Sequence, residues 1–180
     1  FPFSSPFTTS TTVGSVTSSR DSSSGQSSDT DGYNTGGFNP PAVFSSIERF
    51  PFNNSFTTAT NIGDLTTIMR DGVGQSSDSD GYNSGGTSLG GVSFSKIERF
   101  PFSNPFSIAT VVGELKTSDL IQGSGQYSSD DGYVSGGQPF RTTITKFPFS
   151  SPFTLSTDVG DLNILNFASA GQSTNTTGYV

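Results

Sequence analysis

The stretch FPFNNSFTTATNIGDL at residues 50–65 decides the fold, because its pattern returns at a fixed interval along the chain. Phe-Pro-Phe begins at residues 1, 50, 100 and 147, so the period is about 50 residues. Each copy runs through Ser, Thr and Asn to a Val/Ile-Gly step, followed by Asp/Glu-Leu in three copies and by Ser15-Val16 in the first. Gly-Gln and Gly-Tyr dipeptides keep the same phase, at Gly25, Gly74, Gly125 and Gly171 and at Tyr33, Tyr82, Tyr133 and Tyr179. We therefore predict a single repeat domain over residues 1–180, with repeats starting near 1, 50, 100 and 147.

Within one period the residues predict short β-strands. In the second copy the predicted strands are Val43–Phe52, Thr57–Ile62, Leu65–Met69, Val73–Ser77 and Tyr82–Ser84, with a hairpin turn through Asp78–Gly81. Pro51 cannot donate a ladder hydrogen bond, so Phe50–Phe52 is expected at a strand end, a bulge or an outer edge. About four short strands per period indicate an all-β fold, and a period of this length is typical of a β-propeller.

The residues also carry a family resemblance. Gly-Tyr-(Asn/Val)-(Thr/Ser)-Gly-Gly, followed by Ile-Glu-Arg-Phe-Pro-Phe, is similar to the kelch pattern. The repeats resemble the kelch-like repeats of proteins from marine cyanophages and related phages, over Tyr133–Gly137, Lys146–Phe149, Thr157–Leu162 and Ala170–Ser173. The first copy departs from that pattern at Ser15-Val16. The resemblance implies a β-propeller of about four kelch-like blades.

A kelch-type blade combines the Gly-Tyr hairpin with the Phe-Pro-Phe hairpin that follows it. Three blades are then expected at residues 20–66, 70–116 and 120–163, and a fourth needs residues 167–180 paired with residues 1–17, within a chain or between chains. Such closure removes exposed sheet edges, which otherwise promote aggregation. The alternative is that the chain is a fragment of a longer ring.

The repeated phase predicts which side chains are buried. The Phe residues of the last three Phe-Pro-Phe copies are expected between blades: Phe50, Phe52, Phe100, Phe102, Phe147 and Phe149. The Gly pairs that follow Gly-Tyr are expected to meet a need for positive φ or close strand approach. Glu48-Arg49 and Glu98-Arg99 are expected to form local ion pairs. Asp29, Asp78 and Asp130 are expected to stay exposed on turns.

Composition excludes several classes of chemistry. The chain has no Cys and no His, so the usual nucleophile–base pairs and zinc ligands are missing. A net charge of −7 argues against nucleic-acid binding, which needs Lys/Arg patches. No apolar run approaches the roughly 20 residues of a membrane span. We expect no enzymatic activity, no catalytic residue and no cofactor.

Paired carboxylates are the remaining candidates for a metal site. Asp29 and Asp31, and likewise Asp78 and Asp80, form Asp-x-Asp-Gly, which is similar to the start of a Ca²⁺ loop but lacks its later bidentate Glu. The fourth copy has Asn175-Thr176-Thr177 instead. The alternative, favoured here, is a solvated hairpin turn whose Asp bonds its own backbone.

Two classes of function remain open. The first is a non-enzymatic structural or adhesion component, of the kind found in a phage tail or fibre, with other virion proteins or copies of itself as partners. The second is a lectin-like propeller that binds a cell-surface glycan at sites repeated between blades. Either would place the protein in a virion or outside the cell. The sequence alone assigns no ligand-binding residue to either function.

Overall fold

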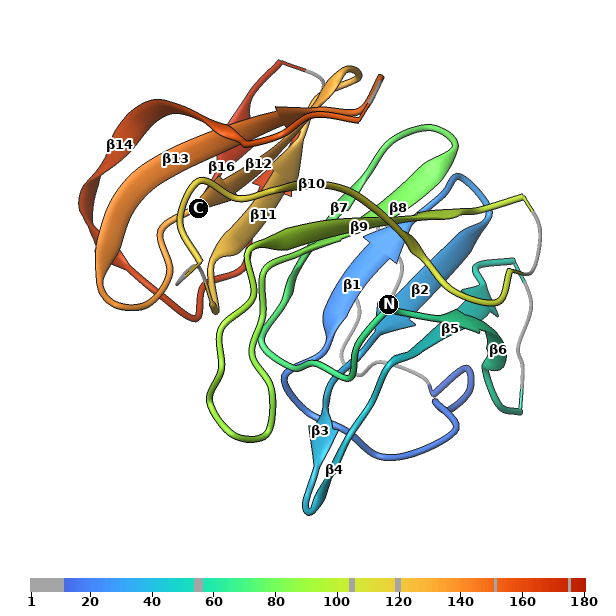
Figure 1. Cartoon of the computed structure of the whole chain (residues 1–180). Helices are drawn as coiled ribbons and strands as arrows, with labels where there is room; N and C mark the ends of the chain where they lie inside the picture. Colours follow the sequence, from blue (N-terminus) through green and yellow to red (C-terminus); the bar gives the residue numbers. More distant parts are fainter. Residues whose placement is uncertain (1–11, 54–56, 104–105, 119–120, 151, 175) are drawn as a thin grey trace.

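The computed structural model of the chain describes residues 12–53, 57–103, 106–118, 121–150, 152–174 and 176–180. These residues form strands and turns with no helix, so the all-β prediction is confirmed. Three four-stranded antiparallel sheets follow one another along the chain (Figure 1). The described part contains no helix long and apolar enough to cross a membrane.

Each four-stranded sheet is a meander of two hairpins. The first sheet contains β1 (Ser24–Ser27), β2 (Asp31–Thr35), β5 (Ser46–Pro51) and β6 (Thr60–Asp64). The second contains β7 (Val73–Ser76), β8 (Asp80–Ser84), β9 (Lys96–Pro101) and β10 (Thr110–Glu114). The third contains β11 (Ser124–Tyr127), β12 (Asp131–Ser135), β13 (Arg141–Pro148) and β14 (Thr157–Asn166). Two small hairpins complete the described structure, β3 (Phe38–Asn39) with β4 (Ala42–Val43), and β15 (Gln172–Ser173) with β16 (Gly178–Tyr179).

The strands of the second copy differ from the prediction in several places. Phe44 and Ser45 interrupt the predicted strand Val43–Phe52, β6 begins at Thr60, and β8 begins at Asp80, inside the predicted turn Asp78–Gly81. Leu65–Met69 is not a strand; β6 instead continues through Gly63 and ends at Asp64. Leu65 and Met69 are buried and their amides bond the carbonyl oxygens of Ser45 and Phe44, so a looping segment carries apolar side chains into the core. Pro51 is the last residue of β5, as expected for a residue without an amide proton.

In the three four-stranded sheets, the Gly of the Gly-Tyr dipeptide lies opposite a Phe of the same sheet. Gly81 on β8 pairs with Phe100 on β9, and a methyl group at Gly81 would lie 2.2 Å from that ring. The same cross-strand pairing joins Gly32 with Phe50 and Gly132 with Phe147. The repeated Gly therefore leaves room for a Phe ring across its own strand.

The Tyr of the Gly-Tyr dipeptide in the first and second sheets packs against the sheet that follows. Tyr33 stacks on Phe102 with ring centroids 4.6 Å apart, and Tyr82 stacks on Phe149 at 4.5 Å. Tyr33 also contacts Phe100, and Tyr82 contacts Phe147. The two described interfaces between four-stranded sheets are thus built from residues at equivalent positions of successive repeats.

The first strands of the sheets also lie side by side, at very close range. A methyl group at Gly74 on β7 would lie 2.1 Å from the carbonyl oxygen of Gly25 on β1, and one at Gly125 would lie 2.1 Å from the carbonyl oxygen of Gly74. Gly171 stands in the same relation to Gly125, at 2.2 Å. Glycine is required at these contacts because backbone packs directly on backbone.

The predicted Phe core is confirmed in part. Phe100 and Phe147 are fully buried, whereas Phe50, Phe102 and Phe149 are half-buried. Phe52 is 56% exposed, so its predicted burial is wrong. Phe102 and Phe149 lie against the Tyr of the preceding sheet, and no described four-stranded sheet precedes the one that carries Phe52.

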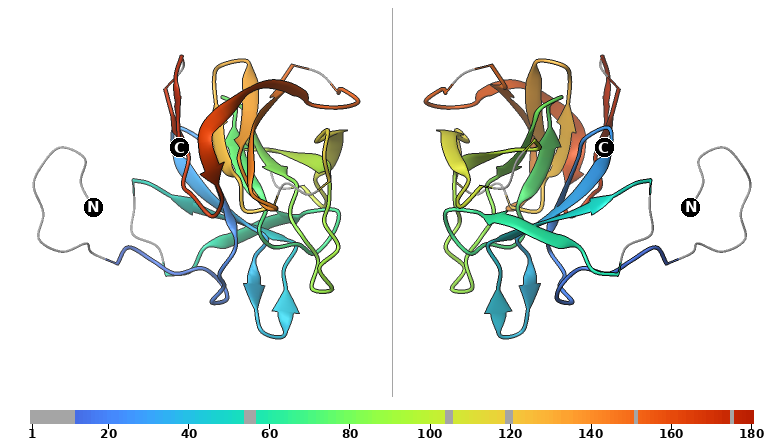
Figure 2. Two further views of the ribbon diagram at one scale, coloured as in Figure 1. Left: turned by 90° about the vertical axis from the view of Figure 1, so that its left-hand side faces the viewer. Right: turned by 90° about the vertical axis from the view of Figure 1, so that its right-hand side faces the viewer.

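The predicted sheet between residues 167–180 and 1–17 is not formed by the described residues. Residues 1–11, with the first Phe-Pro-Phe copy, lie outside them. Ser15 bonds the backbone of Thr57 and Ala59 beside the first sheet, while β15 and β16 pair with each other and lie beside β11. The β3–β4 hairpin projects at the opposite end of the molecule from β16 (Figure 2).

Candidate functional site

Three similar turns lie at one end of the molecule, toward the top of Figure 1. They join β1 to β2, β7 to β8 and β11 to β12. In the first, the amide of Ser28 donates to the carbonyl oxygen of Asp31, and the Ser28 hydroxyl oxygen accepts from the Asp31 amide at 3.0 Å. Ser77 with Asp80 and Ser128 with Asp131 repeat this arrangement. Thr174 and Thr177 do the same in the fourth copy, whose turn sequence has no Asp.

The second Asp of each pair is already engaged by its own sheet. Asp31 accepts a hydrogen bond from the Thr30 hydroxyl at 2.6 Å and lies 4.0 Å from the Arg49 guanidinium. Asp80 has the equivalent partners, Ser79 and Arg99. The described residues contain no group of three or more His, Cys, Asp or Glu side chains that could hold a metal ion. These contacts favour the turn interpretation of Asp31 and Asp80 over the Ca²⁺ alternative.

The first Asp of each pair has a different environment from the second. Asp29, Asp78 and also Asp130 are exposed, as predicted. Asp29 and Asp78 line a polar cleft of about 280 Å³ formed by all three turns. Each turn contributes three consecutive residues to it, namely Ser27–Asp29, Ser76–Asp78 and Tyr127–Ser129. Hydroxyl and carboxylate oxygens beside one aromatic ring suit a neutral ligand rich in hydroxyl groups.

Buried glutamines hold the turns in register. Gln26 donates to the carbonyl oxygen of Tyr82 in the next sheet at 2.9 Å, and its own oxygen accepts from the Thr35 hydroxyl at 2.6 Å. Gln75 bridges to Tyr133 in the same way, and Gln126 to Tyr179. The sequence shows this Gln in every repeat, but its bridging role depends on a neighbouring sheet that no single repeat reveals.

The expected ion pairs within Glu48-Arg49 and Glu98-Arg99 are wrong. Adjacent residues of a strand face opposite sides, so the Glu and the Arg separate. Glu48 is fully buried and is paired with Arg20 and Thr17, and Glu98 is fully buried beside Lys96 and the amide of Thr66. Arg49 and Arg99 instead reach the turn carboxylates described above.

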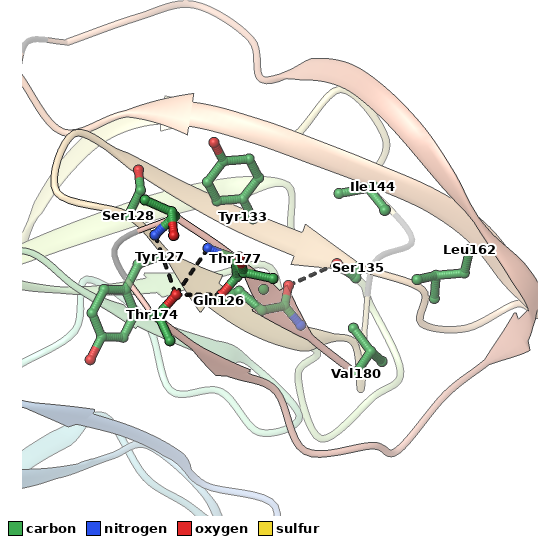
Figure 3. A pocket seen from close by; sticks show the side chains of 12 residues that line it. Gln126, Tyr127, Ser128, Tyr133, Ser135, Ile144, Leu162, Thr174, Thr177 and Val180 are labelled. Carbon is green, nitrogen blue, oxygen red and sulfur yellow. Dashed lines mark hydrogen bonds between the residues drawn. The ribbon is translucent and has the colours of Figure 1, made fainter.

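A second, more apolar cavity of about 490 Å³ lies between the third sheet and the β15–β16 hairpin. Figure 3 shows Tyr133, Ile144, Leu162 and Val180 around it, with Gln126 and Thr174 nearer the turn. The sequence does not predict this cavity. Its walls come from the third sheet and from the β15–β16 hairpin, and no single repeat shows that these two pack together.

The sequence matches no protein-family model and none of the curated proteins.

Proposed function

We propose that the three sheets are blades of a β-propeller-like assembly and that the protein is a non-enzymatic structural or adhesion component, of the kind found in a phage tail or fibre. The observation that carries this proposal is the repetition of one polar turn on a tightly packed stack of sheets. The phage assignment comes from the resemblance of the repeats.

Two features support a propeller-like arrangement. The first strands are neighbours, β1 beside β7 and β7 beside β11, and each of them is the edge strand from which the rest of its sheet continues. The Tyr–Phe contacts between sheets recur with nearly the same geometry. Blades of a propeller are related by a repeated rotation of this kind.

The polar groups support recognition or assembly more than catalysis. A catalytic site needs titratable groups in different environments, whereas Asp31 and Asp80 have matching partners in successive repeats. The sequence also lacks the Cys and His side chains that most often act as nucleophile or base.

Mass spectrometry of purified virions from the source of the sequence tests the structural assignment. We expect the protein in the particles at a fixed stoichiometric ratio to the other tail or fibre proteins. Its absence from particles that are otherwise complete would overturn the virion assignment.

The polar cleft favours one alternative, a lectin-like function. Its serine hydroxyls, the carboxylates of Asp29 and Asp78 and the half-exposed Tyr127 could hydrogen bond and stack on a sugar. A glycan array tests it. Specific binding that is lost in Asp29→Ala and Asp78→Ala but kept in Asp130→Ala would assign the cleft as the site, because Asp130 is an exposed turn residue outside it.

A further inference from the structure

A row of hydrogen bonds joins the first strands of the repeats along the polar cleft. The amide of Ser27 on β1 donates to the hydroxyl oxygen of Ser76 on β7 at 2.9 Å. The amide of Tyr127 on β11 donates in the same way to the hydroxyl oxygen of Ser173 on β15 at 3.2 Å. Each of these four residues directly follows the Gln of its repeat. The serine hydroxyl of one first strand therefore satisfies the amide of the strand before it.

The row is interrupted at Tyr127. Ser76 has the same register in its hairpin as Ser27, so its amide also points out of the hairpin, toward β11. The equivalent residue of β11 is Tyr127, whose side chain has no hydroxyl group on Cβ. Among the described residues, no serine takes toward the Ser76 amide the place that Ser76 takes toward Ser27. Ser76 is only 3% exposed, and a buried amide without an acceptor is costly.

The polar cleft of about 280 Å³ lies at this interruption, because Ser76 and Tyr127 both line it. Tyr127 is 38% exposed, and Figure 3 shows its ring directed away from Ile144 and Leu162, which line the more apolar cavity. The aromatic residue that breaks the serine row thus belongs to the wall of the polar cleft.

The two carboxylates of the cleft are also without protein partners. Within the described residues, Asp29 and Asp78 form no hydrogen bond and no ion pair through their side chains, in contrast to Asp31 and Asp80. Asp130, which lies outside the cleft, accepts a hydrogen bond from the neighbouring Ser129 hydroxyl at 3.2 Å. The cleft therefore combines one buried donor with two acceptors that the folded chain leaves free.

These groups select the chemistry of a ligand. The amide needs an acceptor, and an ionised carboxylate can only accept. An ammonium group donates but cannot accept from the amide, and an anionic ligand would face two like charges. Adjacent hydroxyl groups of a neutral sugar provide both functions side by side, and the apolar face of a sugar ring can stack on an aromatic ring.

We propose that a neutral sugar binds at one place in the cleft, between the β7–β8 and β11–β12 turns. Its hydroxyl groups accept from the Ser76 amide and donate to Asp78 and Asp29, and its ring lies against Tyr127. This inference rests on the lectin-like function considered above, and it names the ligand class and the residue that creates the site. The site occurs once and not in every repeat, because the other three repeats have serine where the third has Tyr127.

One substitution towards the sequence of the other repeats tests the site. Tyr127→Ser removes the ring and supplies a hydroxyl oxygen that accepts from the Ser76 amide, so the serine row becomes continuous. The variant should therefore stay folded, with a melting temperature at or above that of the wild type. Tyr127→Phe keeps the ring. Tyr179→Ser is the matched control, since it removes a ring that is 58% exposed and lies outside the cleft.

Saturation-transfer difference NMR measures the binding, with the methyl glycosides of glucose, mannose and galactose as neutral probes and N-acetylneuraminic acid as the anionic one. We expect the wild type, Tyr127→Phe and Tyr179→Ser to bind at least one neutral glycoside and not the acid. Tyr127→Ser should bind the same glycoside at least about tenfold more weakly, as expected for the loss of one hydrogen bond and one stacking contact.

The possible failures can be told apart. A wild type that binds none of these sugars, and no glycan on an array, overturns the lectin-like function and this site with it. Sugar binding that is equally strong in the wild type and in Tyr127→Ser overturns this site and leaves the lectin-like function standing. Binding of N-acetylneuraminic acid as tight as that of the neutral glycosides overturns the assigned ligand class.

Discussion

The hydroxyl group of Tyr82 donates a hydrogen bond to the backbone carbonyl oxygen of Phe149, 3.3 Å away, while the two rings stack face to face. One Tyr thus joins two sheets by an apolar contact and a polar one. Because Tyr82 and Phe149 lie 67 residues apart in the chain, this contact forms only when two complete sheets have formed and docked.

Alkaline pH should weaken this interface. Burial raises the pKa of Tyr82, and also that of Tyr33, above the ordinary value of about 10. The folded state then keeps a proton that the unfolded chain loses, so the contribution of these tyrosines to the free energy of unfolding is constant below about pH 10 and falls as the pH rises further. Denaturant titrations from pH 8 to pH 11 should show this fall, and Tyr82→Phe should make it shallower. If the free energy of unfolding of Tyr82→Phe falls with pH as steeply as that of the wild type, the raised pKa of Tyr82 does not contribute to the fall.

The Phe residues should differ sharply in their effect on stability. Phe147 is fully buried, so Phe147→Ala should lower the free energy of unfolding by about 3–5 kcal/mol. Phe52 is mostly exposed, and Phe52→Ala should cost less than about 1 kcal/mol at concentrations where the protein is monomeric. Chemical denaturation of both variants measures the difference. Similar losses would mean that Phe52 is covered in the folded monomer.

Substitutions of the glycines on the first strands should also differ in their effect on stability. A methyl group at Gly74 meets backbone at 2.1 Å, so Gly74→Ala should destabilise the protein by at least about 1–3 kcal/mol. The same change at Gly25 meets nothing and should leave the melting temperature of the monomer nearly unchanged. A tolerated Gly74→Ala would show that β1 and β7 are farther apart than described.

The buried ion pair of Arg20 and Glu48 should matter more than an exposed one. Both side chains are at most 1% exposed, so Arg20→Met leaves a buried carboxylate without its cation and should cost about 3–5 kcal/mol. The control is Lys116→Met, which breaks an exposed pair with Asp158 and should cost about 0–1 kcal/mol. If the hydrogen bonds from Thr17 alone stabilise the Glu48 carboxylate, Arg20→Met and Lys116→Met will have similar melting temperatures.

Calcium should have little effect on stability. The carboxylates of Asp31 and Asp80 are occupied by a hydroxyl group and a guanidinium. Calorimetric titration with Ca²⁺ after chelation should therefore detect no tight binding, and the melting temperature should not rise. Tight binding that Asp29→Asn or Asp78→Asn abolishes would instead identify these residues as ligands.

The sequence was most informative where a local rule applies. The positive φ of Gly36 and Gly85, the exposed Asp turns and the strand end at Pro51 all follow from the backbone preferences of single residues. Leu65–Met69 was misassigned because apolar residues in a loop that enters the core have the composition of a strand. The two-residue period of a strand places Glu48 and Arg49 on opposite faces, so a pair between them does not form.

The contacts between sheets could not be predicted in the same way. The partner of Tyr33 lies in the following repeat, and nothing in one copy distinguishes Phe52, which is exposed, from Phe102, which is covered. Their environments differ only because neighbouring sheets are present or absent on one side, which is a property of the assembly and not of the local sequence.

The glycine contacts between first strands have a consequence for how the protein opens. Since backbone touches backbone from Gly25 to Gly171, the spacing of the sheets is fixed by main-chain atoms and does not depend on side-chain rotamers. The second sheet is held between two four-stranded sheets in this way, the first is held on one side only, and the third has the small β15–β16 hairpin on its other side. In an array whose stability is a sum of nearest-neighbour terms, amide hydrogen exchange should be slowest in β7 and β8 and faster in β1 and β2, so the molecule should fray from its outer sheets toward its middle.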